Sequence, residues 1–152
     1  MSNFSTKNIY VWQYKVYPNN AGIPPEFVGG IMTLFDWFLV AHVIGDFLLQ
    51  TDTEANQKMH GSIFNWPLWR HVSKYTAVCA TPLFLHGLSL LWLLPIFISH
   101  LFFDRRWPII WWRKHVMRNS EASIAKNFWL TIVVDQIFHI LVLVAITVIA
   151  SK

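Results

Sequence analysis

The sequence is short of cysteine and of charge, and both shortages limit what the protein can be. Cys79 is its one cysteine, which excludes an internal disulfide and a metal centre built from several thiolates. Lys, Arg, Asp and Glu make up 13% of the residues, whereas about a quarter of a typical soluble domain is charged. The stretch from Tyr75 to Phe103 contains none of these four residues. A soluble globular domain of ordinary composition is therefore a poor match.

Apolar and aromatic residues take the place of the missing charge. Hydrophobic residues reach 55% of the chain, the mean hydropathy is +0.40, and there are nine tryptophans. Tryptophan near the ends of apolar segments is typical of the interfacial belts of membrane proteins. The alternative is a soluble helical protein with an aromatic core. We expect an integral membrane protein whose main partner is the lipid bilayer.

The apolar segments predict an all-α fold with two parts. Residues 1–30 are polar and aromatic and are interrupted by Pro and Gly, which predicts an N-terminal arm at the membrane surface. Residues 31–152 predict an integral membrane bundle of four transmembrane helices, at 31–50, 66–86, 88–112 and 123–150. The bend between the second and third helices would fall at Pro82, Gly87 and Ser89. A three-span alternative, with 75–103 as one tilted helix, scatters the charged residues over both faces and fits less well.

Basic residues set the predicted orientation. Loops 51–65 and 105–126 would share one side, and their basic residues are Lys58, Arg105, Arg106, Arg113, Lys114, Arg118 and Lys126. The opposite side would carry Lys7, Lys15 and Lys152. By the positive-inside rule the first side is cytoplasmic and both termini lie outside. The net charge of +4 then matches anionic lipid, and no nucleic acid is expected as a partner.

Four of these basic residues, Arg105, Arg106, Arg113 and Lys114, surround a run of aromatic and aliphatic residues. Such a pattern is typical of an anchor at the lipid headgroups. The same tract could recruit a phosphate-bearing lipid substrate, because guanidinium groups bind phosphate through two parallel hydrogen bonds.

Polar residues interrupt the apolar segments at one-turn spacing. They are His42, Asp46 and Gln50, then His71 and Tyr75, then His100 and Asp104, and finally Asp135, Gln136 and His139. Residues four apart lie on the same face of a helix. In the four-span arrangement all of these side chains would lie at one depth, near the cytoplasmic side. Because ionisable side chains in lipid need a partner, a metal or water, we expect them to meet in one pocket.

Imidazole and carboxylate ligands without sulfur favour zinc, manganese or ferrous iron. The predicted ligands are His42, Asp46, His100, Asp104 and His139, enough for one ion or for two. Asp135 would orient or deprotonate a metal-bound water, and His71, supported by Tyr75, would protonate a leaving group. Gln50 and Gln136 would hold the ligands in place. The predicted function is a metal-dependent hydrolase acting at the cytoplasmic interface on a lipid-linked or other headgroup-bearing substrate.

Two other interpretations stay open. A His/Asp pair one turn apart can be a hydrogen-bonded pair that fixes helix register, and the protein would then be a non-catalytic subunit of a membrane complex, docked through residues 1–30. A proton or ion pathway is less favoured, because the second span lacks carboxylates. We expect His60, His86 and His115 to lie outside the cluster. Asp36 lies off the polar face, where it could pair with the arm or with a partner subunit.

Four motifs of the chain resemble the domain-of-unknown-function family 3307, small multi-pass membrane proteins of bacteria and their phages. The motifs are Ala41–Asp52, His71–Thr76, Ser99–Asp104 and Asp135–His139, and the resemblance covers about residues 31–150. It implies a location in the bacterial inner membrane but no particular activity. In its His and Asp residues on membrane helices, the chain is also similar to membrane-bound metal-dependent hydrolases. Residues 1–30 and Asp36 depart from the family pattern.

Overall fold

A computed structural model describes residues 32–59 and 63–152, and this part of the chain is all-helical, as predicted. Its α-helices are α2 (Leu34–Val43), α3 (Asp52–Gln57), α4 (Trp66–Leu85), α5 (Leu93–Phe103), α6 (Trp107–His115), α7 (Glu121–Lys126) and α8 (Phe128–Ala150). A π-helical turn, Ile44–Leu48, continues α2, and a 3₁₀ turn, Leu90–Trp92, precedes α5. The predicted N-terminal arm and His60 lie outside the described residues.

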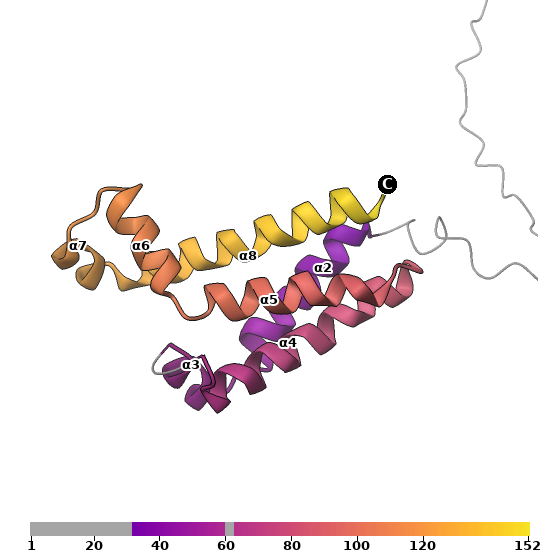
Figure 1. Cartoon of the computed structure of the whole chain (residues 1–152), viewed down its shortest axis with the longest axis horizontal. Coiled ribbons are helices and arrows are strands. Elements are labelled where there is room, and N and C mark those ends of the chain that lie inside the picture. The colour runs from indigo at the N-terminus through magenta and orange to yellow at the C-terminus, as the bar shows by residue number, and fades with distance from the viewer. Residues whose placement is uncertain (1–31, 60–62) are drawn as a thin grey trace, which may run out of the picture.

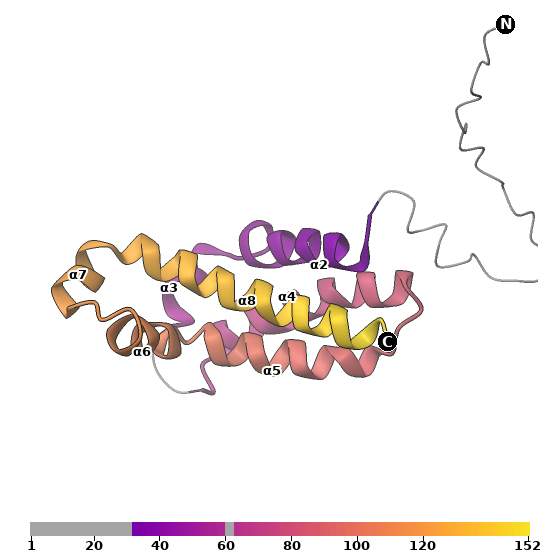
Figure 2. The same ribbon diagram turned by 90° about the horizontal axis from the view of Figure 1, so that it is seen from above.

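Four helices, α2, α4, α5 and α8, pack side by side along the long axis of the molecule (Figure 1). Helix α4 contacts α2 and α5, and α8 contacts the same two helices from the other side. The short helices α3, α6 and α7 gather toward one end, while the C-terminus, the start of α2 and the turn between α4 and α5 lie at the other (Figure 2). The bundle therefore has two different ends.

Local sequence signals explain where the first helices begin. Thr33 caps α2 and Asp36 bonds back to the Thr33 amide at 2.7 Å, which completes a capping box. Thr51 and Glu54 form the same motif at the start of α3. Asp36, whose partner the sequence left undecided, thus caps its own helix.

Two predicted boundaries are wrong. Segment 88–112, predicted as one span, is divided into α5 and α6 at Arg106, which has a left-handed φ of 56°. Such a φ is unfavourable for a residue with a side chain and ends the helix. Of the three residues predicted at the next bend, Gly87, at φ 63°, and Ser89, which caps the 3₁₀ turn, lie there, whereas Pro82 lies inside α4.

The half of the bundle near the C-terminus has an apolar core. It is made of Leu34, Phe38, Ala41, Tyr75, Cys79, Leu83, Ile96, Leu143 and Ile146. Cys79 is fully buried there, so its thiol serves as a small core side chain. This core holds α2, α4, α5 and α8 together and leaves the other half of the same helices for polar residues.

Among the described residues, α8 is the one helix that is long and apolar enough to cross a membrane, judged by length and composition. Only 28% of its most apolar window is buried within the protein. Helices α2 and α5 have 10 and 11 residues, and α4 carries Arg70 and Lys74 in its first half. The structure thus yields one candidate span where the sequence predicts four.

Candidate metal centre

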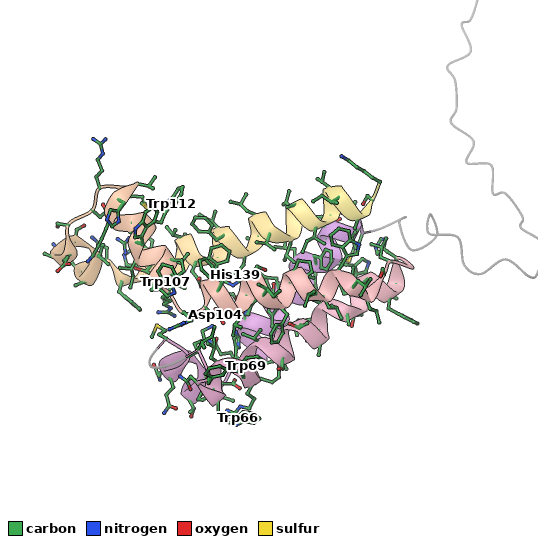
Figure 3. All side chains as sticks on the ribbon, in the orientation of Figure 1. Trp66, Trp69, Asp104, Trp107, Trp112 and His139 are labelled. Carbon is green, nitrogen blue, oxygen red and sulfur yellow. The ribbon has the colours of Figure 1, made fainter. Side chains whose placement is uncertain are left out.

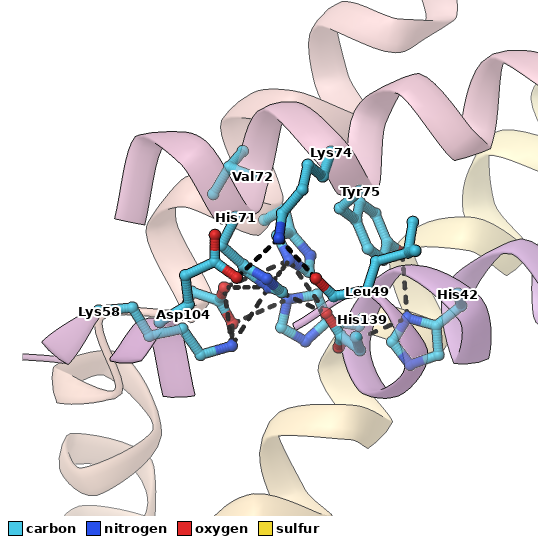
Figure 4. Close-up of polar contacts among 12 residues, drawn as sticks. His42, Leu49, Lys58, His71, Val72, Lys74, Tyr75, Asp104 and His139 are labelled. Atoms are coloured by element: carbon cyan, nitrogen blue, oxygen red, sulfur yellow. Dashed lines mark hydrogen bonds and ion pairs between the residues drawn. The ribbon is translucent and has the colours of Figure 1, made fainter. Parts of the chain in front are cut away.

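A cluster of buried histidine and aspartate side chains lies where α2, α4, α5 and α8 meet near α3 (Figures 3 and 4). Its members are His42, Asp46, Lys58, His71, His100, Asp104, Asp135 and His139, each no more than 5% exposed. The sequence-predicted residues therefore come together from segments far apart in the chain. His86 and His115 lie elsewhere, at the end of α4 and on α6, as predicted.

Three ligand atoms in this cluster form a compact triangle. His71 Nε2 lies 3.0 Å from His100 Nε2 and 3.0 Å from Asp104 Oδ2, and the third side, His100 Nε2 to Asp104 Oδ2, is 3.2 Å. Tetrahedral zinc with bonds of about 2.0–2.1 Å separates its ligand atoms by about 3.3 Å. The triangle therefore matches one face of such a site. Asp46 Oδ1 is a further oxygen 3.2 Å from both ring nitrogens.

The π-helical turn brings Asp46 into this cluster. A π turn widens the helix by one residue and is frequent at functional sites. Gly45, inside the turn, lies against α4, and a Cβ added there would come within 2.7 Å of Tyr75 Cδ2 and 3.2 Å of Tyr75 Cα. Only glycine allows this approach of η1 (Ile44–Leu48) and α4, so Gly45 is a positioning residue that the sequence pattern did not reveal.

His42, predicted as a metal ligand, has protein partners at both of its ring nitrogens. Its Nδ1 is 3.0 Å from the Tyr75 hydroxyl and its Nε2 is 2.9 Å from Gln136 Oε1, so both ring nitrogens are engaged. Tyr75 therefore supports His42 and not His71, while its ring stacks on His100 at 3.7 Å between centroids. His71, predicted as a proton donor, contributes one of the three atoms of the triangle.

The two glutamines have different surroundings. Gln136 Oε1 accepts a hydrogen bond from His42 Nε2 at 2.9 Å, and Gln136 Nε2 donates to Asp46 Oδ2 at 3.1 Å, so this side chain links α8 to α2 and to the π turn. The side-chain oxygen of Gln50 is buried without a hydrogen-bond partner in the described part of the chain. Its predicted contact with the ligands is therefore not seen.

A second set of ligand atoms shares Asp104 with the triangle, and His139 also lies in a group with Asp46 and His100. Asp104, Asp135 and His139 bring one ligand atom each to within 4.8 Å of one another. His139 Nε2 faces Asp104 Oδ1 at 3.9 Å, and His139 Nδ1 lies 2.8 Å from the carbonyl oxygen of Asp135. Asp104 thus presents one carboxylate oxygen to each of two groups of ligands.

Lys58 is the member of the cluster that sequence reasoning missed. Its Nζ donates to Asp104 Oδ1 and Oδ2 at 3.0 and 3.1 Å and lies 3.3 Å from His71 Nε2 (Figure 4). The sequence assigned Lys58 to an exposed cytoplasmic loop because it follows a polar stretch. The capping box at Thr51 predicts that a helix starts there, but no local signal reveals the long-range contact with α5.

Glu54 fixes α3, and with it Lys58, against α4. Its buried carboxylate accepts hydrogen bonds from Lys74 Nζ at 2.7 Å, Arg70 Nε at 2.7 Å and the Thr51 amide at 2.8 Å. Burial alone would raise the pKa of Glu54, but these bonds lower it to about 2. Lys74 also donates to the carbonyl of Leu49, so the same lysine ties the end of the π turn to α3.

Only part of the predicted basic tract, Arg105, Arg106, Arg113 and Lys114, lies on the surface. Arg113 is fully buried and donates from Nη1 to Thr131 Oγ1 at 2.6 Å and to the carbonyl of Asn127 at 3.1 Å. Arg106 is 9% exposed, with its guanidinium over the Phe128 ring. The prediction of a headgroup contact is therefore wrong for Arg113, which joins α6 to α8. Lys114 pairs with Glu121, and Arg105 lines a shallow apolar pocket.

The donor set fits a divalent metal. Imidazole nitrogens and carboxylate oxygens suit zinc, manganese or ferrous iron, and the cluster offers no thiolate. Two buried ligand atoms, Asp135 Oδ1 and His139 Nε2, have no hydrogen-bond partner within the described residues. Because buried acceptors are normally paired, these atoms suit coordination better than a closed hydrogen-bond network.

Comparison with known proteins identifies the family of the chain. The family model described as "Protein of unknown function (DUF3307)" matches residues 34–152. No curated protein and no solved structure matches the chain. The matched range includes every side chain of the cluster, and the resemblance carried by the four sequence motifs is confirmed. The chain belongs to the DUF3307 family.

Proposed function

We propose that this protein is a metal-dependent hydrolase of a membrane, with its metal held by His71, His100 and Asp104. The observation that carries the proposal is the triangle of their ligand atoms, with sides of 3.0–3.2 Å, in a pocket whose members are almost fully buried. Three protein ligands that leave a further coordination position are the usual composition of a catalytic zinc site.

Each neighbouring residue has a role in this proposal. A divalent cation supplies two things in such a site: it acidifies bound water and polarises an ester or phosphoryl oxygen. Asp46, 3.2 Å from both ring nitrogens, would be a fourth protein ligand only for manganese or ferrous iron, which take more than four ligands and so keep a position for water. Asp135, which brings a carboxylate oxygen within 4.8 Å of a ligand atom of Asp104, would orient a bound water or take a proton from it. Lys58 places a positive charge beside the ligands, where it can attract an anionic substrate.

A membrane location and a lipid-type substrate are supported by the surface around the cluster. Figure 3 shows Asp104 and His139 between Trp66 and Trp69 on one side and Trp107 and Trp112 on the other. Such an arrangement of tryptophans suits a membrane interface. The four-span bundle in the bacterial inner membrane, with the basic end cytoplasmic, remains our proposal for how the chain is inserted, and α8 is its best-supported span.

An apolar hollow beside the cluster offers room for a hydrocarbon chain. It has a volume of about 360 Å³ and is lined by aromatic residues of α5, α6 and α8, including Phe103, Trp107, Trp112 and Phe138. Phe103 joins the hollow to the cluster, because its ring lies 5.8 Å from that of His139. A substrate with its chain here would present its headgroup to the ligands.

The second candidate is a non-catalytic subunit of a membrane complex. The contact of Lys58 with Asp104 favours it, because an ammonium group can neutralise the carboxylate without any metal. In that case the cluster fixes helix register, and exposed side chains such as Leu91, Phe84 and Trp66 face a partner protein.

Metal analysis of the detergent-purified full chain separates the two candidates. We expect bound zinc, manganese or iron in the wild type, and its loss in the double variant His71→Ala with His100→Ala. His115→Ala is the matched control, because that histidine is exposed on α6 and should keep full metal content. Zinc, manganese and iron are each supplied alone to the wild-type protein. If it binds none of them, that result would falsify the hydrolase proposal and favour the non-catalytic subunit.

A further inference from the structure

We propose that Asp104 bridges two divalent cations, the second of which is held by Asp135 and His139. The inference rests on the function proposed above, which needs only one ion. Asp104 lies between two groups of ligands: its Oδ2 is 3.0 Å from His71 Nε2 and 3.2 Å from His100 Nε2, and its Oδ1 faces His139 Nε2.

The imidazole of His139 is held in the orientation that a ligand needs. Its Nδ1 lies 2.8 Å from the carbonyl oxygen of Asp135. A carbonyl can only accept, so in the neutral ring Nδ1 carries the hydrogen and Nε2 keeps its lone pair. That lone pair is on the side of Asp104. A metal-binding histidine commonly has its second nitrogen fixed to a carbonyl in this way.

Two of the three acceptors in this second group have no hydrogen-bond donor, whereas the third, Asp104 Oδ1, accepts from Lys58 Nζ at 3.0 Å. His139 Nε2 and Asp135 Oδ1 each lack a hydrogen-bond partner in the described part of the chain, and both residues are 3% exposed. Lys58 contacts the Asp104 oxygens and His71, with no hydrogen bond to Asp135 or His139 among its contacts. The Lys58 ammonium reaches Asp104 but not the other two side chains, so a cation among Asp104, Asp135 and His139 would give Asp135 Oδ1 and His139 Nε2 the partner that they lack.

The spacing permits a single ion to contact this group. The 3.9 Å between Asp104 Oδ1 and His139 Nε2 is shorter than two metal–ligand bonds of about 2.1 Å each. Two carboxylates and one imidazole form a harder donor set than the two imidazoles and one carboxylate of the first site. Manganese(II), which prefers oxygen ligands, is therefore the class of ion that the second site should take most readily.

The decisive experiment counts manganese in the full chain. Detergent-purified protein is loaded with Mn²⁺ alone, freed of unbound metal, and measured by elemental analysis and electron paramagnetic resonance. We expect two ions per chain in the wild type, with the spectrum of a spin-coupled pair, because a carboxylate bridge couples the two spins. Asp135→Asn and His139→Gln should each retain one ion and show the spectrum of isolated Mn²⁺.

The matched control is Asp52→Asn, which makes the same chemical change at an exposed position of α3 and should still bind two coupled ions. One uncoupled ion in the wild type, with no loss in Asp135→Asn, would overturn the bridge but leave the one-metal hydrolase standing. No ion in the wild type would overturn both proposals. Because the wild-type count and spectrum need no variant, the test holds even if a substituted chain fails to fold.

Discussion

The same four helices build two halves of the bundle that differ in almost every respect. Near the C-terminus, α2, α4, α5 and α8 meet through apolar side chains such as Phe38, Leu83 and Leu143. Toward α3 they meet through histidines and aspartates that are buried just as deeply. Tyr75 stands at the boundary, since it belongs to the apolar core and also contacts His42.

This difference separates the residues that stabilise the fold from the polar cluster that the fold contains. Burying an apolar side chain contributes about 1.5–3 kcal/mol, so the apolar half is sufficient reason for the helices to associate. Buried carboxylates cost several kcal/mol each unless they are paired, and apolar residues of similar volume would hold the helices at least as well. The association of the helices therefore does not require the polar half, which is consistent with the proposed metal site.

The largest effect that we expect comes from removing the carboxylate shared by the polar half. Asp104→Ala should lower the free energy of unfolding by about 3–5 kcal/mol, because it leaves the buried ammonium of Lys58 without its counter-charge. Chemical denaturation in detergent, with a chelator present, measures the contribution of the protein's own contacts.

Its control is the double variant Asp104→Ala with Lys58→Met, which removes both charges. We expect the double variant to be more stable than Asp104→Ala alone, because no unpaired charge stays buried. Equal stability of the two variants would mean that Lys58 does not depend on Asp104, contrary to the 3.0 and 3.1 Å contacts.

Shortening a side chain in the apolar half should lower the stability of the protein without changing how much metal it binds. Leu83→Ala removes a fully buried side chain and should cost about 2–5 kcal/mol, the range for Leu→Ala in a packed core. Phe84→Ala, at a neighbouring position that is 78% exposed, is the control and should change stability far less. Loss of bound metal in folded Leu83→Ala protein would show that the two halves are not independent.

Sequence reasoning predicted the polar cluster because its members follow helical periodicity. His100 and Asp104, or Asp135 and His139, are one turn apart, and their positions within long apolar segments already place them near one end of the bundle. The roles within the cluster could not be predicted in the same way. Which nitrogen of His42 is engaged, and by Tyr75 or Gln136, depends on how α2 packs against α4 and α8.

The errors in the predicted spans and in the basic tract have a common cause. The predicted span 88–112 runs through Arg105 and Arg106, but the left-handed backbone at Arg106 turns the chain into a separate helix, α6. That turn directs Arg113 inward to Thr131, although an arginine beside tryptophans in a sequence is typical of a membrane surface. The turn at Arg106 and the inward contact of Arg113 both depend on how the helices pack, so they cannot be predicted from composition or hydropathy.

The smallest expected effect tests how α3 is held in the position that places Lys58 in the cluster, and the size of this effect depends on pH. Glu54 has a folded-state pKa of about 2, below its ordinary 4.5. The stabilisation that it provides is therefore complete above pH 4.5 and is lost as the pH falls through about 2. We expect Glu54→Gln to be less stable than the wild type by about 1.5–3 kcal/mol at neutral pH, as for a hydrogen bond to a charged group. In denaturation curves the gap should narrow as the solution is acidified. A gap that is unchanged from neutral pH to about 3 would mean that the bonds of Glu54 to Lys74 and Arg70 do not stabilise the position of α3.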